Sequence, residues 1–112
     1  MGTHVKINGG SKHQREIAKA VVLFCLGEFR MRKMPFIDVK ITSLDGYWGY
    51  CTGSQKIGVE KNQTIRNFVA TIVHEMVHAK QYFTGEWRGT GEMEARQLQY
   101  KITDKIWKKG LI

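Results

Sequence analysis

The feature that most constrains the fold is a predicted helix over residues 65–83, which contains the stretch TIVHEMVHAKQYF. At about 100° per residue, His74 and His78 lie about 40° apart on one face of such a helix. A chain of 112 residues is long enough for one modest core, against which the other side of this helix must pack. Apolar side chains gather within about 60° of the direction opposite the histidines: Ile65, Phe68, Val69, Ile72, Met76 and Phe83.

His74, Glu75 and His78 form the pattern His-Glu-x-x-His. Two imidazoles one turn apart can bind one tetrahedral cation, and the glutamate beside the first can reach a metal-bound water as general base. A random chain of this length would match the pattern on the order of a few times in a thousand. The pattern therefore predicts a zinc site with His74 and His78 as ligands and Glu75 as the catalytic base.

A catalytic zinc needs a third protein ligand. His4 and His13 lie far upstream, and the segment HAKQYFTGEW that starts at His78 contains no third histidine. The His-x-x-Gly-x-x-His extension of other zinc peptidases is therefore absent. A carboxylate is the economical candidate, and Glu92 and Glu94 begin the last predicted helix, although an acidic first turn is also an ordinary response to the helix dipole.

The string HEMVH, followed on the next helix by EMEAR, resembles the gluzincin metallopeptidases and small zincin-like proteins encoded by phages and bacteria. In gluzincins the third ligand is a glutamate in a Glu-x-x-x-Asp pattern, so the resemblance implies Glu92, with Glu94 as the alternative. The chain departs from the pattern at Arg96, where the family has an aspartate that supports a zinc-bound histidine. Another residue must supply that support. The resemblance covers residues 68–100.

The other segments predict an α+β fold with a small antiparallel sheet. Together with the resemblance, they imply a minimal zincin-like domain over residues 1–112, with an N-terminal helix, the sheet, the active-site helix and the ligand helix. The predicted elements are a strand at HVKI (4–7), a helix capped by Ser11 and running to about Lys33, strands at 36–42, 47–53 and 56–61 around an Asp45-Gly46 turn, and a helix over 92–109.

Lys and Arg outnumber Asp and Glu by 18 to 10, which gives a formal charge of +8. Such a surplus favours an acidic partner such as nucleic acid. The clusters RMRK (30–33) and KIWKK (105–109) are short, however, and lie at predicted helix ends, where cations complement the helix dipole. We therefore expect a solvated basic surface and only weak, salt-sensitive binding to DNA.

No run approaches the roughly 18 apolar residues of a membrane span, and the N-terminal stretch lacks the apolar region of a secretory signal. These features predict a cytoplasmic protein without a membrane partner. Cys25 and Cys51 lie far apart in unrelated contexts, so we expect reduced, structural thiols.

The sequence thus predicts a zinc-dependent metallopeptidase that hydrolyses peptide bonds in a peptide or protein substrate, with zinc-bound water activated by Glu75. The zincin resemblance implies that the substrate lies along the strand before the active-site helix, KIGVEK (56–61). Tyr82, Tyr100 and Arg96 are candidates for stabilising the oxyanion.

The sequence is also compatible with two alternatives. One is a SprT-like, nucleic-acid-associated protease, although such families usually take a third histidine. The other is a non-catalytic, metal-stabilised binding protein. Glu75 argues against the second, because a structural site has no use for a base beside an open coordination position.

Overall fold

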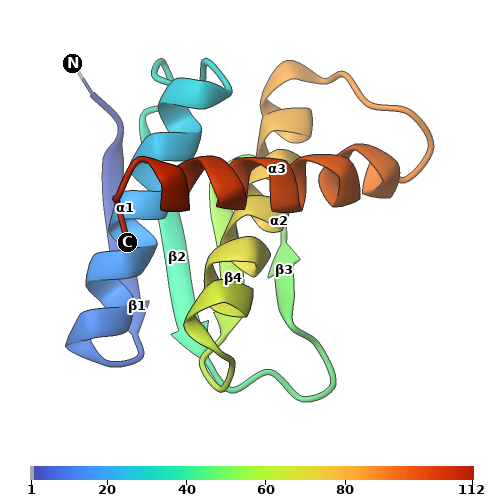
Figure 1. Ribbon diagram of the computed structural model, residues 1–112. Coiled ribbons are helices and arrows are strands. Elements are labelled where there is room, and N and C mark those ends of the chain that lie inside the picture. The colour runs from blue at the N-terminus through green and yellow to red at the C-terminus, as the bar shows by residue number, and fades with distance from the viewer. Residues whose placement is uncertain (1) are drawn as a thin grey trace.

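The computed structural model describes residues 2–112 and contains three helices and a four-stranded sheet, an α+β arrangement (Figure 1). The predicted fold class is confirmed at this level. In chain order the elements are β1 (His4–Gly9), α1 (Lys12–Glu28), β2 (Phe36–Thr42), β3 (Gly49–Cys51), β4 (Lys56–Glu60), α2 (Ile65–Thr84) and α3 (Glu92–Lys108).

The sheet is mixed, so the prediction of an antiparallel sheet was wrong. The strand order is β1-β2-β4-β3, in which β1, β2 and β4 are parallel and only β3 is antiparallel to its neighbour. A helix joins β1 to β2, and a connection of this kind returns the chain in the parallel sense. The Asp45-Gly46 turn does not join neighbouring strands but lies in the connection between β2 and β3, with Gly46 at φ +85°.

Burial explains why β4, rather than β3, pairs with β2. Four of the five residues of β4 are buried, as expected for a central strand, whereas β3 has three residues and none of them is buried. The strand KIGVEK is therefore internal, and β3 is the edge. This corrects the predicted substrate edge.

All three helices lie on one side of the sheet (Figure 1). Helices α1 and α2 pack on the strands, and α3 crosses over α2, which makes α2 the central helix of the domain. The predicted apolar side of α2 is confirmed at Phe68, Val69, Ile72 and Met76, which are at most 2% exposed, whereas Ile65 and Phe83 at its ends are exposed. The strands contribute Ile37, Val39, Ile41, Ile57 and Val59 to the same core.

The helix ends follow local signals in the sequence. Ser11 caps α1 through a capping box with Gln14, and Gly85 closes α2 in a left-handed conformation. Helix α1 ends at Glu28 instead of the expected Lys33, because Arg30 takes a left-handed conformation (φ 57°) that stops the helix.

Cys25 is buried and Cys51 is half-buried, and both are free thiols. None of the helices described is long and apolar enough to cross a membrane.

Candidate metal centre

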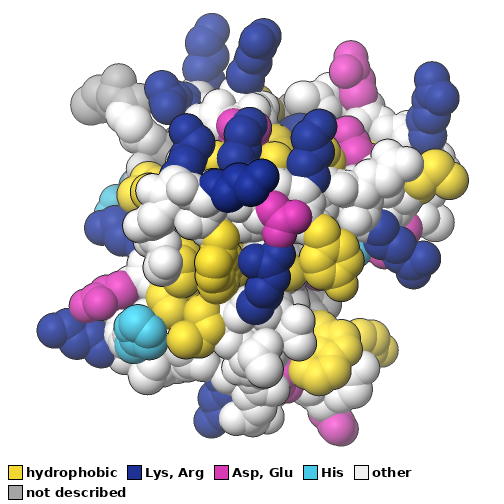
Figure 2. All heavy atoms as spheres, viewed as in Figure 1, with side chains coloured by type: hydrophobic (Ala, Val, Ile, Leu, Met, Phe, Trp, Pro, Cys, Tyr) yellow, Lys and Arg dark blue, Asp and Glu magenta, His cyan; other side chains and the backbone are white. Residues whose placement is uncertain are grey.

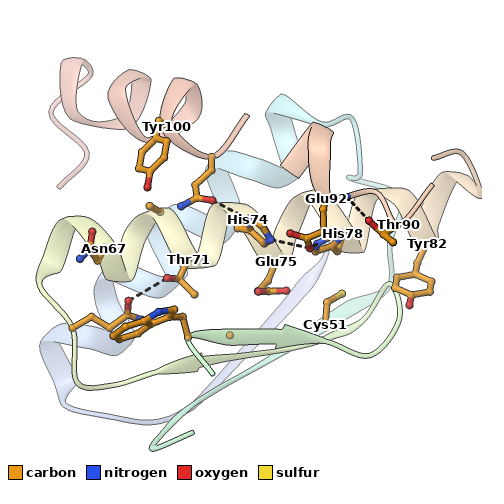
Figure 3. A pocket seen from close by; sticks show the side chains of 15 residues that line it. Cys51, Asn67, Thr71, His74, Glu75, His78, Tyr82, Thr90, Glu92 and Tyr100 are labelled. Atoms are coloured by element: carbon orange, nitrogen blue, oxygen red, sulfur yellow. Dashed lines mark hydrogen bonds and ion pairs between the residues drawn. The ribbon is translucent and has the colours of Figure 1, made fainter. Parts of the chain in front are cut away.

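The two histidines lie on the side of α2 that faces the first turns of α3 (Figure 3). Thr64 caps α2 by accepting a hydrogen bond from the Asn67 N–H. The helix therefore begins at Ile65, one turn before Phe68, its first buried residue. The spacing of four residues places the imidazole rings of His74 and His78 edge to face, with centroids 5.0 Å apart. Both side chains are less than one-fifth exposed.

Helix α3 brings Glu92 to this pair. Glu92 Oε1 lies 3.3 Å from His74 Nε2 and 2.6 Å from His78 Nε2. One ligand atom from each of the three residues lies within 4.8 Å of the others, the arrangement that a single metal ion requires. For comparison, two ligands of a tetrahedral zinc are about 3.4 Å apart, given metal–ligand distances near 2.1 Å. The predicted ligands are thus brought together.

The other nitrogen of each imidazole is held by a glutamine. His74 Nδ1 lies 2.8 Å from Gln99 Oε1, and His78 Nδ1 lies 2.9 Å from Gln81 Oε1. An amide oxygen can only accept a hydrogen bond, so each Nδ1 carries the proton and each Nε2 presents its lone pair. Gln99 and Gln81 are thus the polar partners of the two imidazoles, a contact that Arg96 does not make.

These tautomers give the cluster the form of a candidate cation site. Two imidazole lone pairs and a carboxylate oxygen are directed at one point, and such a set is mutually repulsive unless a cation or a proton lies between its members. Two nitrogens and one oxygen are also the kinds of donor that zinc accepts. The residues present therefore fit a zinc ion.

Glu94, the alternative ligand, points away from the histidines. Its Oε2 accepts a hydrogen bond from Lys80 Nζ at 2.7 Å, and its Oε1 accepts one from Gln81 Nε2 at 2.9 Å. Gln81 Nε2 also donates to the Gly91 carbonyl, which fixes the amide with its oxygen toward His78. Glu94 therefore contacts Gln81, the residue that contacts His78, whereas Glu92 contacts both histidines directly.

Glu75 lies beside the cluster, against the edge strand (Figure 3). A Cβ atom at Gly49 of β3 would lie only 2.9 Å from Glu75 Oε2 and 2.8 Å from Thr71 Cγ2. The absence of a side chain at Gly49 therefore lets the carboxylate approach the strand. Burial raises the pKa of Glu75; the two imidazoles oppose this shift, and the charge of Glu92 adds to it. A carboxylate with a raised pKa is suited to accept and later return a proton.

The cluster opens into a cleft of about 680 Å³ between β3, α2 and α3. Tyr100 and Asn67 lie toward one end of it, and Tyr82 and Thr90 toward the other (Figure 3). Cys51 lines the same cleft, and burial raises the pKa of its thiol to about 11. Both tyrosines proposed from the sequence thus border the cleft.

Arg96 does not border the cleft. Its side chain is 77% exposed, and its Nε lies 3.7 Å from Glu92 Oε2 on the preceding turn of α3. Burial by itself would raise the pKa of Glu92, but hydrogen bonds and positive charge from the two imidazoles, when these carry a proton on Nε2 in place of a cation, outweigh burial and hold the pKa below its usual range.

Comparisons of the chain with known protein families, with curated proteins and with solved structures found no match.

Proposed function

We propose that the protein is a zinc-dependent metallopeptidase built on a zincin-like domain. The observation that carries the proposal is the convergence of His74 Nε2, His78 Nε2 and Glu92 Oε1 beside the buried carboxylate of Glu75. Three ligands leave one position of a tetrahedral ion open, and a base next to that position is the requirement for hydrolysis.

The arrangement of the elements also supports a zincin-like domain. The active-site helix α2 and the ligand helix α3 follow the sheet in the expected order, and an antiparallel edge strand runs beside α2. The order of N-terminal helix, sheet, active-site helix and ligand helix is the one that the gluzincin resemblance implies, and it supports the proposal at that level.

The residues have separate roles in the proposed reaction. His74, His78 and Glu92 would hold the zinc ion, which would supply a Lewis acid for the scissile carbonyl and for water. Glu75 takes a proton from the attacking water and passes it to the amine that leaves. Gln99 and Gln81 keep the imidazoles in the tautomer that presents Nε2.

The open edge of β3 suits an extended peptide. The Trp48 carbonyl accepts a hydrogen bond from the Glu60 N–H, and the Thr52 N–H donates to the Lys56 carbonyl. The backbone groups of Trp48 and Thr52 therefore face β4. In an antiparallel pair the intervening residues direct their N–H and C=O groups the other way, which leaves those of Gly49 and Cys51 facing outward. A substrate strand can pair with them along the cleft, a mode of binding in which main-chain hydrogen bonds provide affinity.

The test separates the base from the ligands. We expect Glu75→Gln to retain one zinc per chain while losing hydrolysis of a quenched fluorescent peptide mixture, and His74→Ala to lose both. Zinc content is measured by metal analysis after gel filtration. Full peptidase activity in the Glu75→Gln protein would refute the assignment of the base. Zinc binding by the unsubstituted chain without hydrolysis of any peptide in the mixture would favour the non-catalytic alternative.

A further inference from the structure

Two basic segments that are far apart in the sequence meet on one side of the molecule. The turn after α1 carries Arg30, Arg32 and Lys33, and α3 carries a row of lysines toward its C-terminal end. Lys105 Nζ lies 2.5 Å from Glu28 Oε2, an ion pair that joins the end of α1 to α3. Figure 2 shows Lys and Arg side chains gathered over these two elements. The clusters that are separate in the sequence are thus neighbours in the fold.

This basic face has a large surplus of positive charge. Among the residues that the structure describes, Glu28 is the acid that forms an ion pair with it. Asp104, also on α3, forms its ion pair with Arg66 of α2 instead. The surplus is therefore not neutralised within the protein. The face consists of seven exposed cations: Arg30, Arg32, Lys33, Lys101, Lys105, Lys108 and Lys109.

Arg30 adds a second observation. It occupies the position after the end of α1 at which glycine is usual, with its N–H directed to the Gly27 carbonyl and the Met31 N–H bonded to the Leu26 carbonyl. A side chain in this left-handed conformation strains the backbone, and glycine would avoid the strain. The chain thus carries a cation on this face at a position where a smaller residue would be less strained.

We infer that the basic face binds double-stranded nucleic acid through its phosphates. Lys101, Lys105 and Lys108 follow one line along α3, and the span from the first to the last is about 10 Å, given a rise of 1.5 Å per residue. Successive phosphates on one strand of a duplex advance 3.4 Å along the axis and also rotate around it, so a straight line of this length faces about two of them. The turn at residues 30–33 extends the contact to one side.

The binding is electrostatic and independent of base sequence, because backbone phosphates carry no sequence information. It does not depend on zinc or on peptide hydrolysis, since none of the seven cations lines the cleft. Helix α3 does, however, carry both Glu92 and the row of lysines, so a bound duplex would lie beside the cleft. A protein already on the nucleic acid would then be held close to the metal centre.

The experiment uses the full chain and a fluorescein-labelled duplex of about 20 base pairs, with anisotropy recorded from 50 to 200 mM salt. The test variant combines Lys33→Glu, Lys101→Glu and Lys108→Glu. The control variant combines Lys12→Glu, Lys40→Glu and Lys61→Glu, which are exposed positions outside the basic face. Each triple lowers the formal charge by six, from +8 to +2, so that a difference between them reports position and not net charge.

We expect the unsubstituted chain to bind with a Kd in the micromolar range at 50 mM salt and to weaken steeply by 200 mM. The test variant should bind at least about tenfold more weakly, and its slope of log K against log salt should be smaller by about 2 to 3, or 0.9 for each lost phosphate contact. The control variant should change the Kd by less than about threefold. If the test variant does not fold, the Lys→Gln versions of both triples replace the two variants, so that the net charges stay matched.

Arg30→Gly provides an independent readout. We expect it to raise the unfolding midpoint, because glycine relieves the strain at φ 57°, and to weaken duplex binding, because one cation is lost. A merely structural role for Arg30 would not weaken binding. Equal weakening by both triples, no binding at 50 mM salt, or tighter binding to vesicles that contain anionic lipid than to the duplex would each overturn the inference.

Discussion

Substitution of Glu92 by alanine tests the metal centre most directly, because the geometry assigns opposite outcomes to two glutamates two residues apart. Glu92 Oε1 is the oxygen that approaches both histidines, at 3.3 and 2.6 Å. Glu94 instead accepts hydrogen bonds from Lys80 and Gln81. Glu92→Ala therefore removes a proposed ligand, whereas Glu94→Ala removes a partner of Gln81, which contacts His78.

The expected magnitudes follow from these positions. Loss of an outer partner of a metal-bound histidine costs about 10- to 100-fold in metal affinity, and loss of a ligand should cost at least the upper end of that range. Glu92 is also the only charged member of the cluster, since the two imidazoles bind as neutral groups. We expect Glu92→Ala to weaken zinc binding by about 100-fold or more, which corresponds to about 2.7 kcal/mol.

Glu94→Ala should weaken zinc binding by less than about threefold, below the 10- to 100-fold range of a direct partner. The reason is that Gln81 keeps its bonds to the Gly91 carbonyl and to His78 Nδ1. Competition of each purified variant against a chelating zinc indicator measures both affinities. The reverse ranking would move the ligand to Glu94, and an unchanged affinity in both variants would remove the carboxylate from the centre altogether.

Three further predictions concern other parts of the structure. Gln99→Leu should weaken zinc binding by about 10- to 100-fold in the same assay, because His74 Nδ1 loses its acceptor; an unchanged affinity would refute that role. Burial raises the pKa of Cys51 to about 11, so at pH 8 this thiol should react with a disulfide reagent about 100-fold more slowly than an unperturbed thiol. Urea should restore the rate, and equal rates in the folded and unfolded chain would contradict the prediction. The pKa of Glu60 lies below its usual value because its carboxylate accepts hydrogen bonds from the N–H groups of Leu44 and Asn62. Its stabilising contribution is therefore complete only above the unfolded pKa of about 4.3, and it is lost as the pH falls through the folded value. Urea titrations from pH 7 to 3 should therefore show a smaller pH dependence for Glu60→Gln, and parallel curves for the two proteins would exclude the contribution.

Features that depend on neighbours in the sequence could be predicted. The bounds of α2 and the common face of His74 and His78 both follow from helical spacing within one segment. The start of α3 at Glu92 was also expected. These features could be predicted because each depends only on residues within a few positions of one another along the chain.

Features that depend on pairing between distant segments could not be predicted. The parallel pairing of β2 with β4 requires the chain to pass through β3 first, and nothing in the residues of the β2–β3 connection specifies which later strand returns to β2.

The glutamine partners of the two histidines were missed for a related reason. Gln81 and Gln99 are ordinary polar residues on helices, and their role arises only once α3 crosses α2.

The glutamines also explain how the centre is positioned. Gln81 lies on α2 and donates to the Gly91 carbonyl and to Glu94, which pins the first turn of α3 onto α2. Further along, Ile102 and Ile106 of α3 are buried in the common core. Helix α3 is therefore held at both ends by contacts between protein groups, and Glu92 is carried to the histidines by the packing of the fold. Because these contacts do not involve His74 Nε2, His78 Nε2 or Glu92 Oε1, the proposed metal ion would not have to order α3 on binding, and the cluster is pre-organised by the fold itself.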